Sequence, residues 1–236
     1  MIYKFSLIFI LMVTIYINTS MISFASEEIS ISYNINKKLT FDEKSSSELK
    51  CLNSEFKKII EEDQGFAIDF HLKLNKFINN NKHSLSSLTA LYMMSITFSL
   101  PETDVSYKKY NDQILQFIIS NYPDSVQSAA SKLALSMKKN DSGNYNEALS
   151  ILKDNYENIL KASNDKYLQN FLDELGINNN IIASYFSALA EIYCSTKNYN
   201  KSIEYYQTII DSFPNSKESK HARLKIETLK ALTQSK

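Results

Sequence analysis

Glycine and proline are scarce in this sequence. The 236 residues include three of each, and they stand singly rather than in clusters. Folds built from short strands need a turn residue about every ten positions, often with the positive φ that glycine adopts most readily. The scarcity therefore excludes a β-sandwich or β-barrel and favours helices, which need far fewer turns.

An excess of charge of either sign is also missing. Lys plus Arg and Asp plus Glu each total 26, so no global field attracts nucleic acid or an anionic membrane surface. With 44% apolar and 22% charged residues, the chain has the balance of a soluble protein with a substantial core. We expect no nucleic-acid partner.

Recognisable catalytic motifs are absent. His71, His83 and His221 form no HExxH or paired-histidine motif, and His71 and Asp69, two positions apart, point away from each other on a helix. There is no GxSxG motif or glycine-rich phosphate loop, and the acidic run 61–63 is typical of solvated charge. We interpret the histidines as surface or half-buried residues and predict no enzyme, cofactor or metal site. An exported hydrolase with an unrecognised site is the alternative.

Cysteine is limited to Cys51 and Cys194, neither of which has a Cys or His neighbour at metal-ligand spacing. An exported chain could oxidise the pair, but a disulfide needs Cα atoms within about 7 Å, which distant helices of a stack rarely provide. We predict two buried free thiols that pack as small apolar side chains, with a disulfide as the alternative.

The N-terminus has the pattern of a secretory signal peptide. Lys4 precedes an apolar run over 5–17, and a polar stretch then ends in Ala25. The run is shorter than the ~20 residues that span a bilayer as a helix. We predict export to the periplasm or the medium, with residues 1–25 removed after Ala25. An uncleaved anchor is the alternative, and would make the chain a membrane-associated envelope assembly subunit.

Residues 26–44 alternate apolar and polar side chains, the period of a strand. No partner strand is evident nearby. We expect a flexible or extended leader, and a lone edge strand or a partner-bound segment over 29–36 remains the alternative. The apolar members are Ile29, Ile31, Tyr33 and Ile35.

Beyond Ser45 the apolar spacing changes to three and four, which predicts helices. The serine run 45–47 could cap the first. Residues 66–74 alternate as in a strand, but a helical stripe also runs over 66–78, and the helix is preferred because the pattern outlasts a usual strand. Gly176 and each proline mark helix ends. The other expected helices are 84–99, 104–121, 125–139, 144–160, 164–175, 178–196, 199–212 and 216–233.

One spacing pattern recurs along these helices. Its clearest copy pairs a small residue in each of two helices, Ala190 and Ser202, so that the helices can approach closely, and Pro214 ends the second. Large residues fill the gaps between the helices. The copies are Phe186, Leu189, Ala190, Tyr193, Ser202, Tyr206 and Pro214; Ala130, Leu133, Ala134, Met137, Ala148 and Leu152; and, in part, Asn111, Leu115 and Pro123.

In residue type and spacing this pattern resembles the tetratricopeptide repeat family. The endings Tyr122-Pro123-Asp124-Ser125 and Phe213-Pro214-Asn215-Ser216 resemble those of bacterial envelope members. The resemblance implies an all-α helical-hairpin repeat solenoid over 45–236, clearest over 183–216. It also implies an exported scaffold that binds other proteins.

The resemblance places a binding groove on the first helix of each pair. The two stripes that would line it are small and nearly neutral, and they lack the Lys, Arg and Asn clamp for a C-terminal carboxylate. We therefore expect a protein or peptide segment in the concave groove and no small-molecule cofactor. The predicted binding residues are Ser128, Ser131, Leu135 and Lys138 in one stripe, and Ser184, Ser187, Glu191 and Cys194 in the other.

Overall fold

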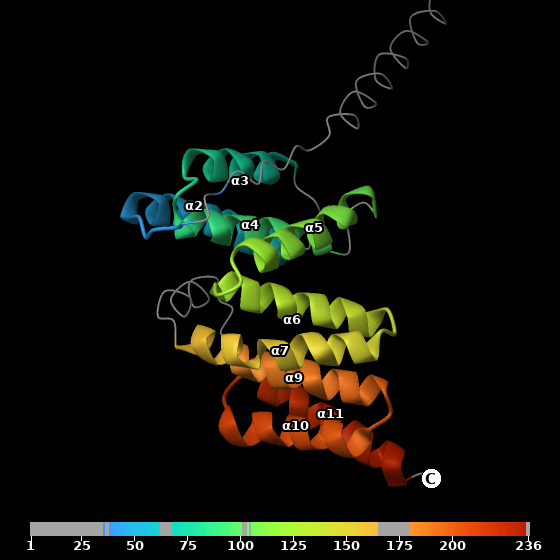
Figure 1. The fold of residues 1–236 in the computed structure, drawn as a ribbon. Helices are drawn as coiled ribbons and strands as arrows, with labels where there is room; N and C mark the ends of the chain where they lie inside the picture. Colours follow the sequence, from blue (N-terminus) through green and yellow to red (C-terminus); the bar gives the residue numbers. More distant parts are fainter. Residues whose placement is uncertain are drawn as a thin grey trace, which may run out of the picture. The chain divides into compact units, whose positions relative to one another are not determined.

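The computed structural model describes residues 38–61, 68–100, 105–164 and 180–234, together with Ile35 and Thr103. All of them lie in the second of the chain's two compact units, which begins at Asn34. In this part of the chain every regular element is an α-helix (Figure 1). The helices are α2 (Glu43–Glu61), α3 (Ile68–Asn80), α4 (Leu85–Ser99), α5 (Val105–Asn121), α6 (Val126–Asp141), α7 (Tyr145–Ser163), α9 (Ile181–Ser195), α10 (Tyr199–Ser212) and α11 (Lys217–Gln234).

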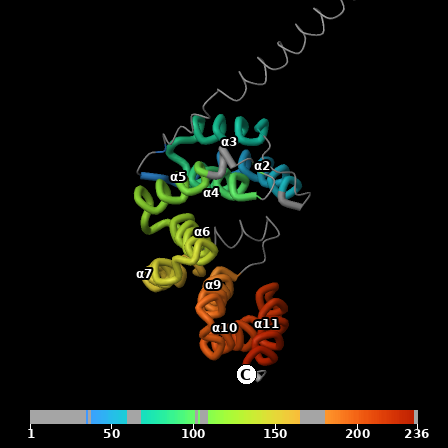
Figure 2. Tube along the Cα trace, turned by 90° about the vertical axis from the view of Figure 1, so that its right-hand side faces the viewer, coloured from blue at the N-terminus to red at the C-terminus, as the bar shows by residue number. Residues whose placement is uncertain are grey.

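The helices form the predicted all-α array of helical hairpins. α4 packs on α5, α6 on α7 and α9 on α10, and successive hairpins touch through α5 with α6 and α7 with α9. The first helices also meet laterally, α4 with α6, α6 with α9, and α9 with α11 (Figures 1 and 2). No helix in the described ranges is long and apolar enough to cross a membrane.

The predicted helices agree closely with the observed ones. The ambiguous segment 66–74 is helical from Ile68 onward, so the strand alternative is wrong there. The predicted helix 164–175 and its Gly176 stop lie outside the described residues, apart from Asn164, which caps the end of α7.

The first helix begins earlier than the serine run predicts. α2 starts at Glu43, and the Asp42 carboxylate accepts the Ser45 backbone N–H at 2.7 Å, so Asp42 makes the capping hydrogen bond. The serine run therefore lies inside the helix. The Ser45 hydroxyl is buried there, 2.6 Å from the Ser84 hydroxyl.

Two first helices end in the same way. After α9, Asn198 N–H donates to the Tyr193 carbonyl at 2.8 Å, and Lys197 N–H donates to the Cys194 carbonyl at 2.9 Å. The equivalent pair of bonds follows α6. At the end of each helix the two bonds form a Schellman motif. It requires a left-handed residue, which is Gly143 (φ 78°) after α6 but Lys197 (φ 61°) after α9. Of the two residues, only Gly143 adopts this conformation without strain.

A buried polar bond ties the second helix of a hairpin to the first. The Ser202 hydroxyl of α10 donates to the Ala190 carbonyl of α9 at 2.8 Å. The Asn111 amide of α5, at the matching position of its hairpin, donates to the Ser95 carbonyl of α4 at 2.6 Å. Asn155 of α7 makes a third bond of this kind at 2.9 Å, to a carbonyl of α6.

The α4–α5 hairpin is a fuller copy of the repeat than the sequence pattern indicates. Its first helix carries Leu91, Met94, Ser95 and Phe98 at the spacing of Phe186, Leu189, Ala190 and Tyr193. The connection that follows is longer: Phe98 and Asn111 are 13 positions apart, whereas Tyr193 and Ser202 are 9 apart. A search at fixed spacing therefore recovers only its second helix.

The two cysteines are free thiols in the structure, in α2 and α9. Cys194 is half-buried and packs against the core between α9, α10 and α11. Cys51 is exposed, so the predicted burial is wrong for that residue, because it lies on the outer face of an amphipathic helix.

Candidate functional site

The first predicted binding stripe, on α6, is largely covered by the protein itself. Ser128 and Ser131 are fully buried and Leu135 is nearly so. The small side chains of the two serines allow neighbouring helices to pack closely against α6. Lys138 is half-buried, and its ammonium bonds Asn111 at 2.8 Å and pairs with Asp112, both in α5. A partner segment could contact only this last residue without displacing a helix.

The second predicted stripe, on α9, faces α11. The Ser184 hydroxyl donates to a carboxylate oxygen of Glu218 at 3.1 Å. Glu191, one helical turn beyond the half-buried Ser187, joins α11 through two basic side chains. Cys194 packs against apolar side chains. The binding role of these residues stays a prediction, but their position is now defined by a neighbouring helix.

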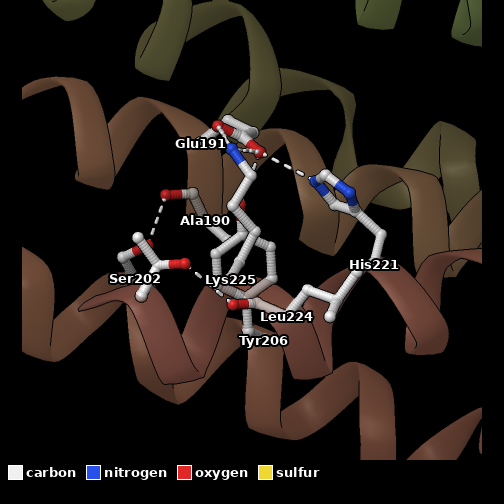
Figure 3. A network of polar contacts seen from close by, with 8 residues as sticks. Ala190, Glu191, Ser202, Tyr206, His221, Leu224 and Lys225 are labelled. Atoms are coloured by element: carbon white, nitrogen blue, oxygen red, sulfur yellow. Dashed lines mark hydrogen bonds and ion pairs between the residues drawn. The ribbon is translucent and has the colours of Figure 1, made fainter. Parts of the chain in front are cut away.

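The centre of this surface is the Glu191 carboxylate (Figure 3). One of its oxygens, Oε1, accepts the Tyr206 hydroxyl at 2.6 Å and lies 3.0 Å from the Lys225 ammonium and 3.3 Å from Nε2 of His221. These groups come from α9, α10 and α11, so one carboxylate joins three helices. We call Ser184, Glu191, Tyr206, Glu218, His221 and Lys225 the polar cluster.

Exposure within the polar cluster increases toward α11. The side chain of His221 is 50% exposed, that of Lys225 35% and that of Glu191 24%, whereas Tyr206 is fully buried. The member on α10 is therefore buried, whereas the members on α9 and α11 form an accessible edge of the cluster. An approaching partner would meet an imidazole, an ammonium and part of a carboxylate.

The environment fixes the charge states of two members of the cluster. Burial would raise the pKa of Glu191, but hydrogen bonds from Tyr206, Lys225 and His221, with the charge of Lys225, outweigh it and hold the pKa below its usual value. Burial, followed by the bond to Glu191, raises the pKa of Tyr206. At neutral pH Glu191 is therefore ionised and Tyr206 is a neutral donor. This arrangement suits binding better than proton transfer.

The remaining candidates for chemistry do not converge on a reactive site. Burial and the neighbouring Glu191 raise the pKa of the Cys194 thiol, which disfavours the nucleophilic thiolate. His71, predicted to be at least half-exposed, is instead buried, with Nε2 2.8 Å from the Thr97 hydroxyl and its ring packed on Phe98. Over the described ranges, no group of His, Cys, Asp and Glu side chains could hold a metal ion.

The spacing pattern did not indicate Glu218, His221 and Lys225 as site residues. A signal for them existed: Ser184 bonds Glu218 and Glu191 bonds Lys225 across the same interval of 34 residues. That interval is the length of one tetratricopeptide repeat. Continuing the stripe of α9 by one repeat would have placed these residues beside it.

Replacing Glu191 with glutamine should lower stability in a pH-dependent way. The carboxyl pKa is lowered in the folded state, so its contribution is present above the unfolded pKa of about 4.3 and is lost as pH falls through the folded value. We expect the variant to be less stable by about 1–2 kcal/mol at pH 7, with the difference shrinking below pH 4.3. Urea unfolding from pH 7 to pH 3 measures it.

The matched control is Glu227→Gln, on the exposed face of α11. It should change stability little at either pH. A Glu191→Gln effect of equal size at pH 7 and pH 3 would contradict the charge-based explanation.

Comparison with known protein families identifies a repeat in the C-terminal part of the chain. A tetratricopeptide repeat family model matches residues 188–216, which include the second half of α9, all of α10 and the turn leading to α11. The match covers the hairpin that carries Glu191 and Tyr206. Neither a curated protein nor a solved structure matches the chain.

Proposed function

We propose that this chain is an exported scaffold that binds a segment of another protein along the accessible edge of the polar cluster. The match of residues 188–216 to a tetratricopeptide repeat supports the scaffold function, since such repeats generally bind protein or peptide partners. The signal-peptide pattern of the first 25 residues supports export.

The observation that carries the site is the partly exposed set of polar side chains on α9 and α11. His221 and Lys225 are donors held in place by Glu191, whose own position is fixed by the buried Tyr206. Polar groups held by a buried partner lose less side-chain freedom on binding than free surface side chains do. The Glu191–Lys225 pair balances its own charge, so we propose a partner segment that offers hydrogen-bond acceptors rather than a high net charge.

Site-specific cross-linking in cells tests this function. A photoreactive residue at Ser187, on the α9 face, should capture a defined protein partner. The same residue at the exposed Gln207 of α10 should not. Lys225→Ala should reduce capture from position 187 several-fold, whereas Lys220→Ala, exposed on the same helix, should not. Equal capture from positions 187 and 207, or no partner at all, would count against the proposal.

The same preparation tests export. Mass spectrometry of the purified chain should show an N-terminus at Ser26, because the predicted cleavage follows Ala25. A chain that still begins at Met1 would refute cleavage while leaving the scaffold proposal intact.

A further inference from the structure

The segment that precedes α2 is docked on the helices through its main chain. Thr40 N–H donates to the His83 carbonyl at 2.8 Å, and Leu85 N–H donates to the Thr40 carbonyl at 3.1 Å. This is an isolated parallel bridge to Ser84, at the start of α4. Thr40, within the leader expected to be flexible or extended, is therefore hydrogen-bonded to the helices. Residues 29–34 lie outside the described residues.

A second anchor lies five residues earlier. The Tyr122 hydroxyl, just past the end of α5, donates to the Ile35 carbonyl at 2.9 Å. The Ile35 side chain is only 8% exposed. At Ile35 and Thr40 the helices therefore contact three main-chain polar groups and one branched apolar side chain. Main-chain hydrogen bonds combined with a buried side chain are the chemistry by which proteins bind extended peptides.

The surface that holds this segment is built independently of it. Ser84 caps α4 by accepting the Ser86 N–H at 3.1 Å, and Tyr122 N–H continues the bonding of α5 by donating to the Ile118 carbonyl at 3.0 Å. On the segment's side, Lys38 and Thr40 are exposed, and Phe41 is 56% exposed. These three side chains thus add little to the core. The surface should keep its structure when the segment leaves.

We propose that this surface is a binding site for extended peptide segments, occupied in cis by Ile35 and residues 38–40 of the chain, with Asp42 left in place as the cap of α2. Its ligand is an extended segment with a branched apolar residue five positions before the residue that pairs with the start of α4. A partner segment of this kind must displace the chain's own. The surface includes no member of the polar cluster, so this inference stands apart from the proposed function.

Competition between the two segments provides the test. A fluorescent peptide of residues 29–42 is titrated against the mature chain and against Ile35→Asp, which weakens the internal segment, with binding measured by anisotropy. We expect Ile35→Asp to bind the peptide at least about tenfold more tightly. The apparent affinity is proportional to the fraction of molecules whose site is free, and the variant should increase that fraction. Adding Tyr122→Phe should weaken that binding about fivefold through loss of one hydrogen bond. A scrambled peptide should not bind.

Thr40→Pro provides a second variant in case Ile35→Asp disturbs folding. It removes the N–H that donates to His83 at an exposed position, and should also increase peptide affinity. Circular dichroism and thermal melting check that the helices persist. Equal peptide affinity for the mature chain and a folded variant, or no binding to either, would overturn the proposal.

Discussion

Replacing Tyr206 with alanine is expected to destabilise the chain by about 3–5 kcal/mol, the cost of removing a large aromatic side chain from a packed core. Tyr206 is fully buried between α9, α10 and α11, in a cluster that includes Ala190, Ile209 and Ile226. Its hydroxyl also donates to Glu191. The alanine variant would lose both the apolar contacts and a donor to a partly buried carboxylate. Urea unfolding followed by circular dichroism measures the change.

Tyr206→Phe separates the two contributions. It keeps the ring and removes only the hydroxyl, so we expect a loss of about 1–2 kcal/mol. In a helical array each repeat is stabilised by contacts within itself and with its neighbours. Tyr206→Ala should therefore reduce amide-exchange protection in residues 181–234 more than in residues 68–121. A uniform loss across both ranges would show that the array unfolds as a single cooperative unit.

Phe98→Ala is expected to produce the opposite pattern, with a similar cost of about 3–5 kcal/mol. Phe98 is fully buried in α4, and its ring centroid lies 4.3 Å from that of His71 and 5.6 Å from that of Tyr110. Amide exchange should increase mainly over residues 68–121. The variant also tests whether His71 is structural, since a histidine held between Phe98 and Thr97 should be loosened with its neighbours.

Phe98→Leu is the milder control. It preserves most of the apolar volume but loses the ring contacts, for which about 1 kcal/mol is expected. In the double variant Phe98→Ala with Tyr206→Ala the two losses should add to within about 0.5 kcal/mol, because α4 and α10 belong to different hairpins. A strongly non-additive result would mean that the two hairpins are coupled through those between them.

Helix positions were predictable because hydrophobic periodicity is a local property. The stripe Phe70, Leu74, Phe77 and Ile78 is buried along one face of α3, as the helical interpretation of 66–78 requires. The start of α2 was not predictable in the same way. Both Asp42 and the serine run have capping side chains, and the choice depends on Ser45 meeting Ser84, 39 residues away. Tertiary contacts decided between two locally acceptable caps.

The candidate site was harder to predict than the fold. The four residues of the α9 stripe lie on one helix, but sequence alone did not show that α11 would lie against it. Ser128 and Ser131 hold the repeat positions on α6 that Ser184 and Ser187 hold on α9, but they face other helices rather than solvent. The exposure of a repeat position depends on how closely its neighbours pack, which spacing does not encode. His71 and Cys51 show the same difficulty, since each has the burial opposite to the one its residue type and position predicted.

The buried bonds from Ser202, Asn111 and Asn155 to carbonyls of the preceding helix also restrict sliding. Two helices joined only by apolar side chains can shift past one another by one turn, about 5.4 Å, and repack. Here such a shift would bury a hydroxyl or amide without its acceptor, at a cost of about 1–3 kcal/mol per hairpin. Each hairpin thus has a single favoured register. Under tension its helices should separate outright rather than ratchet through intermediate pairings.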